Sequence, residues 1–142
     1  MTNTEEKKLP RGLRNCNPLN LRRSHDLWQG LREEQTDPEF FQFKTMAWGY
    51  RAAFVVIRTY VWKWKLTTLV DIVSRWAPDA DGNDSELYLA RVRALTGMGK
   101  YDTINPLSQE QMIPLVEAMS RIENGQRAKP QEVQEGWLLY MG

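Results

Sequence analysis

The stretch Met112-Ile-Pro-Leu-Val-Glu-Ala-Met-Ser-Arg-Ile-Glu-Asn-Gly125 decides how this chain folds. On a helix, where successive residues are about 100° apart, its apolar side chains form one stripe. The stripe consists of Met112, Leu115, Val116, Met119 and Ile122. Glu123 falls inside it, roughly 20° from Met112 on the helical wheel, and the next two residues, Asn and Gly, are types that end helices in a left-handed conformation. The sequence therefore predicts a core helix that carries a carboxylate toward the core in its last turn.

Such a position has a chemical consequence for Glu123. Apolar neighbours and the negative end of the helix dipole both disfavour the charged form, so the pKa of this glutamate is expected to rise. A glutamic acid that stays protonated near neutral pH can protonate a leaving oxygen, as in glycoside cleavage. Glu123 is therefore a candidate general acid. The alternative is that Glu123 lies at a frayed helix end and turns its carboxylate to water.

The length of 142 residues suits one domain with its own core. Residues 1–9 are polar and charged, which predicts a disordered arm, and residues 10–142 form the domain. The net charge of +1 gives no general attraction to nucleic acid. The chain has no apolar run long enough for a signal peptide or a membrane span. We therefore expect synthesis in the cytoplasm without a signal peptide, no membrane insertion, and delivery by another system if the substrate lies outside the membrane.

No metal or other cofactor is expected. Cys16 is the single cysteine and His25 the single histidine, so neither an internal disulfide nor a His/Cys zinc set can form. The acidic run at 79–84 resembles a calcium loop in composition, but position twelve, counted from Asp79, is Ala90 rather than the closing glutamate. This run is interpreted as a polar turn and helix cap.

The remaining pattern predicts a mostly helical, α+β domain. Short strand-like pieces at 22–23, 27–31 and 40–43 are separated by turn residues, and they predict a small antiparallel β-hairpin near the N-terminus. Apolar residues at three- and four-residue spacing predict helices after it. These helices are expected at 47–64, 69–76, 87–95, 109–124 and 130–140.

The opening of the domain, Arg11-Gly-Leu-Arg-Asn-Cys-Asn-Pro-Leu-Asn-Leu21, resembles the Arg-Gly-Ile-Arg-Asn-Asn-Asn-Pro-Gly-Asn-Ile opening of lysozyme-like proteins encoded by phages and mobile elements. The resemblance continues in order through Trp28-x-Gly, Asp37-Pro, Trp76-Ala-Pro and Glu123-Asn-Gly. It implies a lysozyme-like single domain. In other members of the superfamily the catalytic glutamate precedes the Asn-rich turn, whereas Glu123 follows it, so the resemblance also implies a circular permutation.

The resemblance implies that the substrate is the glycan strand of bacterial peptidoglycan and that Glu123 protonates the oxygen between two sugars. A hydrolase needs a second carboxylate, and the candidates are Asp37, Glu34 and Glu33. Without one, the 6-hydroxyl of muramic acid closes onto the anomeric carbon, as in a lytic transglycosylase, and we favour this outcome. Virion or secretion-apparatus proteins are possible partners, and the site of action is the cell wall or periplasm.

Sugars bind to flat aromatic faces and to amide or hydroxyl groups. The candidates for the substrate groove are Asn15, Asn17, Asn20, Trp28 and Tyr50. Each also has a structural interpretation, in a turn, in the hairpin or at a helix start. Trp62, Trp64 and Trp76 lie on apolar helix faces and are expected in the core. The alternative to an enzyme is a non-catalytic virion structural or glycan-binding protein that keeps the fold.

Overall fold

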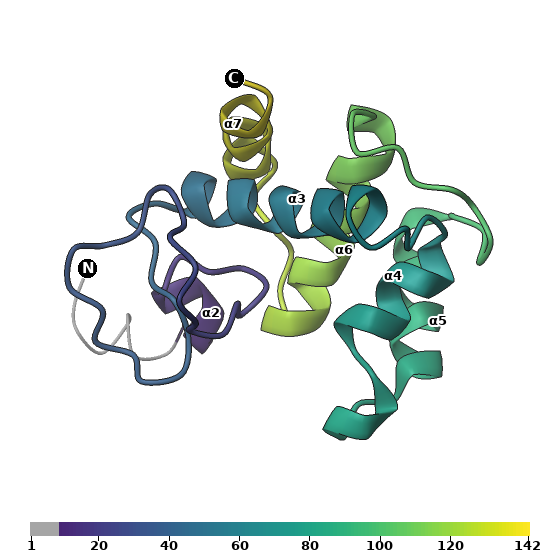
Figure 1. Cartoon of the computed structure of the whole chain (residues 1–142), viewed down its shortest axis with the longest axis horizontal. Helices are drawn as coiled ribbons and strands as arrows, with labels where there is room; N and C mark the ends of the chain where they lie inside the picture. Colours follow the sequence, from purple (N-terminus) through teal and green to yellow (C-terminus); the bar gives the residue numbers. More distant parts are fainter. Residues whose placement is uncertain (1–8) are drawn as a thin grey trace.

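Residues 9–142 are described by the structure, a computed structural model, and their regular structure is helical (Figure 1). The arm expected at residues 1–9 lies, except for Leu9, outside the described residues. The helices are α2 (Arg11–Arg14), α3 (Met46–Trp62), α4 (Leu69–Trp76), η1 (Asp79–Asp81), α5 (Ser85–Thr96), α6 (Gln109–Asn124) and α7 (Pro130–Met141). The prediction of a mostly helical domain is therefore confirmed.

Local capping residues start and end these helices. The hydroxyl groups of Thr45, Thr68 and Ser108 accept hydrogen bonds from backbone N–H groups in the first turns of α3, α4 and α6. Pro130 occupies the first turn of α7, where its missing N–H has no helical partner to lose. Gly125 ends α6 with φ of 73°, a left-handed conformation that favours glycine. The last turn of α6, which carries Glu123, is thus held at a defined position.

The core forms around α3, which packs most extensively against α7 (Figure 1). Tyr50, Phe54 and Ile57 of α3 are completely buried. The ring of Phe54 meets that of Trp137 of α7 edge-on, with centroids 5.2 Å apart and an interplanar angle of 83°. α6 also contacts α3, so the helix that carries Glu123 is anchored in this core.

The predicted β-hairpin is wrong. Within residues 9–142 there is no β-sheet, and the segments expected to pair are joined by two isolated antiparallel bridges, Arg22 with Phe40 and Leu31 with Phe43. The segments around Arg22 and Leu31 each form one bridge with the 40–43 stretch, and neither continues into a ladder of paired residues. The region from 15 to 45 is an ordered set of loops, with the short helix α2 before it.

Side chains replace the missing strand ladder. The Oε1 of Gln42 accepts hydrogen bonds from the backbone N–H groups of Thr36 and Asp37. The carboxylate of Asp37 accepts two more, from the N–H groups of Glu39 and Phe40. These donors would otherwise need partners on a neighbouring strand, so the loops satisfy them without a sheet.

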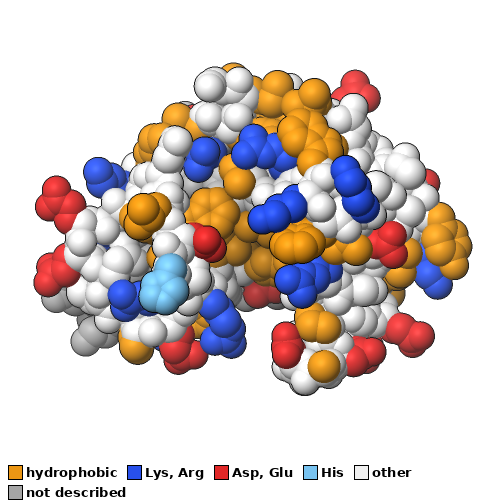
Figure 2. Space-filling view, in the orientation of Figure 1, with side chains coloured by type: hydrophobic (Ala, Val, Ile, Leu, Met, Phe, Trp, Pro, Cys, Tyr) orange, Lys and Arg blue, Asp and Glu red, His pale blue; other side chains and the backbone are white. Residues whose placement is uncertain are grey.

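The molecule has two lobes with a hollow between them. In Figure 1 the 15–45 loops and α2 form one lobe, α4 and α5 form the other, and the C-terminal end of α6 lies between them. The space-filling view shows the surface hollowed between the lobes (Figure 2). None of the described helices is both long and apolar enough to cross a membrane.

Candidate functional site

Glu123 lies in the last turn of α6 and is half-buried between the two lobes. Its Oε2 accepts a hydrogen bond from the hydroxyl of Tyr88 on α5, at 3.2 Å. The indole Nε1–H of Trp76, at the end of α4, donates a longer one of 3.4 Å to the same oxygen. Donors from α4 and α5 thus hold the carboxyl group, and the side chain of Asn20 approaches it from the loop after α2.

Burial raises the pKa of Glu123 above its ordinary value. The donors Trp76, Tyr88 and Asn20 act in the opposite direction, because they stabilise the carboxylate, but burial has the larger effect. The pKa of Tyr88 is also raised, by burial and by the negative charge of Glu123, so the phenol remains a neutral donor. The predicted rise in the pKa of Glu123 is confirmed, and a proton is available there closer to neutral pH than on an exposed glutamate.

Glu123 lines an open groove of about 940 Å³ between the lobes. The loop after α2, the end of α3, the end of α4 and the turn around η1 all contribute to it. Its lining residues are Leu19, Asn20, Leu21, Arg22, Phe40, Tyr60, Arg75, Trp76, Ala77, Asp81, Asn83 and Glu123. The groove therefore offers aromatic faces, amides and arginines around the carboxyl group.

The loop after α2 is tied directly to the helix end that carries Glu123. The Asn124 side-chain Nδ2 donates to the carbonyl oxygen of Pro18, at 2.8 Å, and to that of Ser120, at 2.9 Å. Gly12 makes this approach possible, because a Cβ there would collide with the Asn124 amide and would lie 2.9 Å from the carbonyl oxygen of Asn17. Residues near the two ends of the chain are thereby brought together beside Glu123.

One of the five predicted groove residues lines the Glu123 groove, and a second lines the pocket next to it. Asn20 lines the groove beside Glu123, and Trp28 lines a pocket next to it. The other three, Asn15, Asn17 and Tyr50, are buried and do not line either space. Each of these has a hydrogen-bonding role elsewhere.

The buried polar residues serve the loops and the core. Asn17 donates to the carbonyl oxygens of Leu21 and Phe41, and its Oδ1 accepts from the Leu21 N–H, which closes the Asn-rich turn. Asn15 donates to Asp37 at 2.9 Å. The hydroxyl of Tyr50 lies 3.2 Å from Oγ of Ser120 inside the core. None of these three side chains is available to a ligand at Glu123.

The three candidates for a second acid lie away from Glu123. Asp37 makes a two-point ion pair with Arg11, with both N–O distances 2.7 Å, and its carboxylate is buried. This guanidinium, together with further donors, holds the pKa of Asp37 well below its usual range. Glu33 and Glu34 are exposed, and none of the three lines the groove. Asp81, an exposed residue of η1, is the other carboxylate that lines it.

The partners of Glu123 were not identified from the sequence. Trp76 was expected in the core, but it is half-buried and its indole N–H reaches the carboxyl group. Tyr88 lies in the helix expected at 87–95, and no role at the site was predicted for it. A tryptophan or tyrosine on an apolar face brings a polar tip that needs a partner when buried, and this was the available signal. The other two tryptophans expected in the core, Trp62 and Trp64, are 48% and 54% exposed.

Among residues 9–142, no group of three or more His, Cys, Asp or Glu side chains is arranged to hold a metal ion. No known family model matches the chain. Protein P5 of Pseudoalteromonas phage PM2 is 38% identical to it over 125 residues, a match that spans 86% of this chain and 76% of that protein. This similarity extends over most of both chains. The chain therefore belongs to the family of protein P5 of phage PM2.

Proposed function

We propose that this protein cleaves the glycan strand of bacterial peptidoglycan as a lytic transglycosylase, with Glu123 as general acid and base. The observation that carries the proposal is the position of Glu123, a half-buried carboxyl group with a raised pKa that lines an open groove and is held by two donors. General acids in glycoside cleavage need this combination of a retained proton and access to substrate.

In the first step, protonated Glu123 gives its proton to the oxygen that bridges two sugars. The bond between that oxygen and the anomeric carbon breaks, and the electron pair leaves with the oxygen. Glu123 is then a carboxylate, which the Tyr88 hydroxyl and the Trp76 indole stabilise by their hydrogen bonds. These donors thus serve the charged form of Glu123 after the proton has left.

In the second step, the 6-hydroxyl of the muramic acid attacks the anomeric carbon and returns its proton to Glu123, which yields a 1,6-anhydro sugar. We favour this internal closure over hydrolysis because Asp37 is held by Arg11 and Glu33 and Glu34 do not line the groove. Hydrolysis with retention or inversion uses a second carboxylate at a set distance. Asp81 is the groove residue that would supply it if hydrolysis occurred.

The groove has the side chains that a glycan strand needs. Tyr60, Trp76 and Phe40 supply aromatic surface against the C–H faces of sugar rings. Asn20 and Asn83 supply amides for hydroxyl and acetamido groups. We infer that the protein acts in the cell wall or periplasm, and that virion or secretion-apparatus proteins deliver it. Membership in the family of a phage protein supports delivery by a virion.

The test is mass spectrometry of soluble products from purified peptidoglycan treated with the wild type and with Glu123→Gln. The wild type is expected to release anhydro-muropeptides, and Glu123→Gln to release none, because glutamine keeps the shape of the side chain and cannot transfer the proton. Reducing-end sugars would instead identify a hydrolase and direct attention to Asp81. Release of products by neither protein would favour a non-catalytic virion structural or glycan-binding role.

A further inference from the structure

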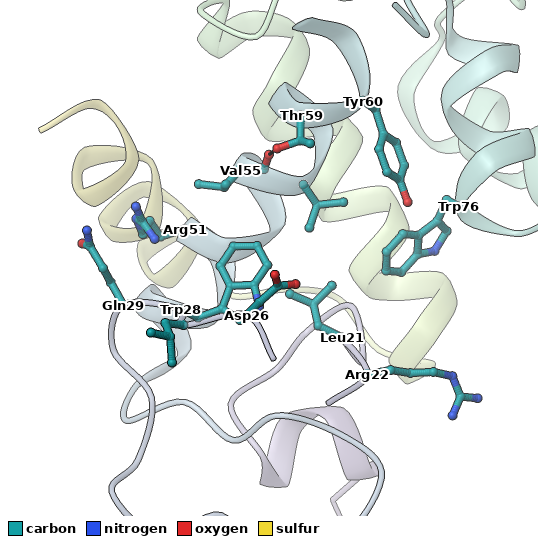
Figure 3. A pocket seen from close by; sticks show the side chains of 12 residues that line it. Leu21, Arg22, Asp26, Trp28, Gln29, Arg51, Val55, Thr59, Tyr60 and Trp76 are labelled. Atoms are coloured by element: carbon teal, nitrogen blue, oxygen red, sulfur yellow. Dashed lines mark hydrogen bonds between the residues drawn. The ribbon is translucent and has the colours of Figure 1, made fainter. Parts of the chain in front are cut away.

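A second pocket lies next to the Glu123 groove. It has a volume of about 540 Å³, and it shares Leu21, Arg22, Tyr60 and Trp76 with the groove. Figure 3 shows Tyr60 and Trp76 at one end of this pocket and Arg51 and Gln29 at the other. A ligand bound at Glu123 can therefore extend a branch past Tyr60 and Trp76 toward Arg51. We call this space the Arg51 pocket.

Part of the wall of the Arg51 pocket is apolar. Leu21, Val55 and Val56 line it, and Trp28 lies between its two ends (Figure 3). Leu27, which also lines the pocket, is 95% exposed, although leucine side chains are usually buried. Such a wall suits methyl and methylene groups rather than the hydroxyl-covered edge of a sugar.

The polar end of the pocket is cationic. Arg51 lies on α3, and it takes part in none of the ion pairs found within residues 9–142. Burial and the neighbouring Arg58 both lower its pKa, so a half-buried positive charge stands here without an acidic partner. Asp26 also lines the pocket, but its carboxylate accepts a hydrogen bond from the Ser24 hydroxyl and is exposed. An anionic ligand would provide the missing partner for Arg51.

We propose that the Arg51 pocket binds the peptide stem of peptidoglycan, with Arg51 pairing with a carboxylate of the stem and the apolar wall covering its alanine methyl groups. The inference rests on the proposed function, because the glycan strand at Glu123 is what brings the stem to the pocket. N-acetylated sugars are neutral, whereas the stem joins small apolar side chains to carboxylates. The stem is therefore the part of the polymer whose chemistry matches both the wall and the guanidinium.

The test measures binding by calorimetry in the Glu123→Gln background, so that no ligand is cleaved. The probes are a disaccharide-tetrapeptide from peptidoglycan and the same disaccharide without the peptide, its lactyl carboxylate capped as a neutral amide. Arg51→Gln is expected to weaken binding of the tetrapeptide form at least about tenfold, the size of one lost charge-assisted hydrogen bond. Binding of the peptide-free disaccharide is expected to stay unchanged.

Arg58→Gln is the matched control, since it removes the same charge from the same helix and Arg58 does not line the pocket. It is expected to leave both affinities unchanged. Arg51→Lys, which keeps the charge, guards against misfolding of the glutamine variant and is expected to bind the tetrapeptide form with intermediate affinity. Equal weakening of both probes by Arg51→Gln, or no weakening of either, overturns the proposal.

The outcomes separate this inference from the proposed function. If the wild type releases no product from peptidoglycan while Arg51→Gln selectively weakens tetrapeptide binding, the cleavage proposal fails and the stem site stands. If the wild type cleaves peptidoglycan and both probes bind equally well to Glu123→Gln, the cleavage proposal stands and the stem site fails.

Discussion

Replacing Asp37 by asparagine separates a structural role of this residue from a catalytic one, because the change keeps the size of the side chain and removes its charge. Asparagine can still accept the hydrogen bonds from the N–H groups of Glu39 and Phe40 through its oxygen. Its NH₂ group, however, would face donors that now bind the second carboxylate oxygen, the guanidinium of Arg11 and the amide of Asn15. The variant thus loses the ion pair with Arg11, and its NH₂ group faces the N–H donors of Arg11 and Asn15 without an acceptor between them.

The expected cost follows from these contacts. A hydrogen bond to a charged group contributes about 1.5–3 kcal/mol when it is shielded from water. The Arg11 side chain is 37% exposed, so solvent weakens the pair and we expect a net loss of about 2 kcal/mol for Asp37→Asn. For a domain of this size that corresponds to a fall in Tm of roughly 4–8 °C.

The pH dependence gives the sign of the effect. The folded-state pKa of Asp37 is lowered, so its stabilising contribution is complete above the unfolded-state value of about 3.9 and is lost as pH falls below it. The difference in Tm between wild type and Asp37→Asn is therefore expected to be full at pH 7 and to shrink below about pH 4.

Thermal melts followed by circular dichroism at pH 7 and pH 3 measure this difference in Tm. Activity is measured as product release from peptidoglycan, at an assay temperature of about 20 °C. Asp37→Asn is expected to keep cleaving at that temperature, where it remains folded. Glu33→Gln, an exposed carboxylate without these contacts, is the control and should leave Tm unchanged. Loss of cleavage with an unchanged Tm would refute the structural assignment and make Asp37 part of the chemistry.

Three further changes test the surroundings of Glu123. Tyr88→Phe removes a donor that stabilises the carboxylate, so the pKa of Glu123 should rise further. The high-pH limb of the rate profile should therefore move to higher pH, and an unchanged limb would count against the hydrogen bond. Glu123→Gln removes a carboxylate whose folded-state pKa is raised, so the variant should have a higher Tm than wild type at pH 7. This difference should vanish below about pH 4, where Glu123 is protonated in both the folded and the unfolded state. A lower Tm for the variant at pH 7 would contradict the effect of burial. Gly12→Ala places a Cβ against the Asn124 amide and 2.9 Å from a backbone oxygen, so urea denaturation should show a loss of about 1–3 kcal/mol, whereas a variant as stable as wild type would mean that the loop relaxes freely.

The helices were predictable because their signals are local. Thr68, Ser108, Pro130 and Gly125 act on backbone groups within one helical turn of themselves, so their effect can be inferred without knowing the tertiary structure. The same holds for Glu123, whose position inside an apolar stripe follows from helical periodicity alone. Its burial in the structure agrees with that inference.

The prediction of a β-hairpin was wrong because it rested on local sequence, whereas the hydrogen bonds that replace strand pairing depend on residues far apart in the chain. The apolar and aromatic residues at 27–31 and 40–43 are compatible with short strands when each segment is considered alone. The backbone N–H groups near 36–40 are instead taken by the side chains of Gln42 and Asp37, and Asp37 is itself fixed by Arg11, 26 residues earlier. A pattern method cannot detect this competition, because each of these residues is an ordinary polar residue in its own segment.

The site was only partly predictable for a related reason. Glu123 could be found on its own helix, but its donors come from α4 and α5, 47 and 35 residues earlier in the chain. Which face of Trp76 is buried depends on how α4 packs against α6, and no spacing within α4 records that. Local pattern therefore identifies the acid and leaves the residues that tune it unassigned.

The Asn-rich turn shows the same limit within a single loop. Asn15, Asn17 and Asn20 are of one type and lie within six residues, yet Asn15 fixes Asp37, Asn17 closes the turn, and Asn20 reaches the groove with φ of 52°. An asparagine in a turn can hydrogen-bond to nearby backbone or point outward, and its residue type alone does not distinguish the two. The hydrogen bond from Asn124 to Pro18 holds this loop against the end of α6, and of the three asparagines Asn20 is the one that lines the groove with Glu123. The position of this loop beside Glu123 thus involves a contact that spans 106 residues of the chain, which no pattern within the loop records.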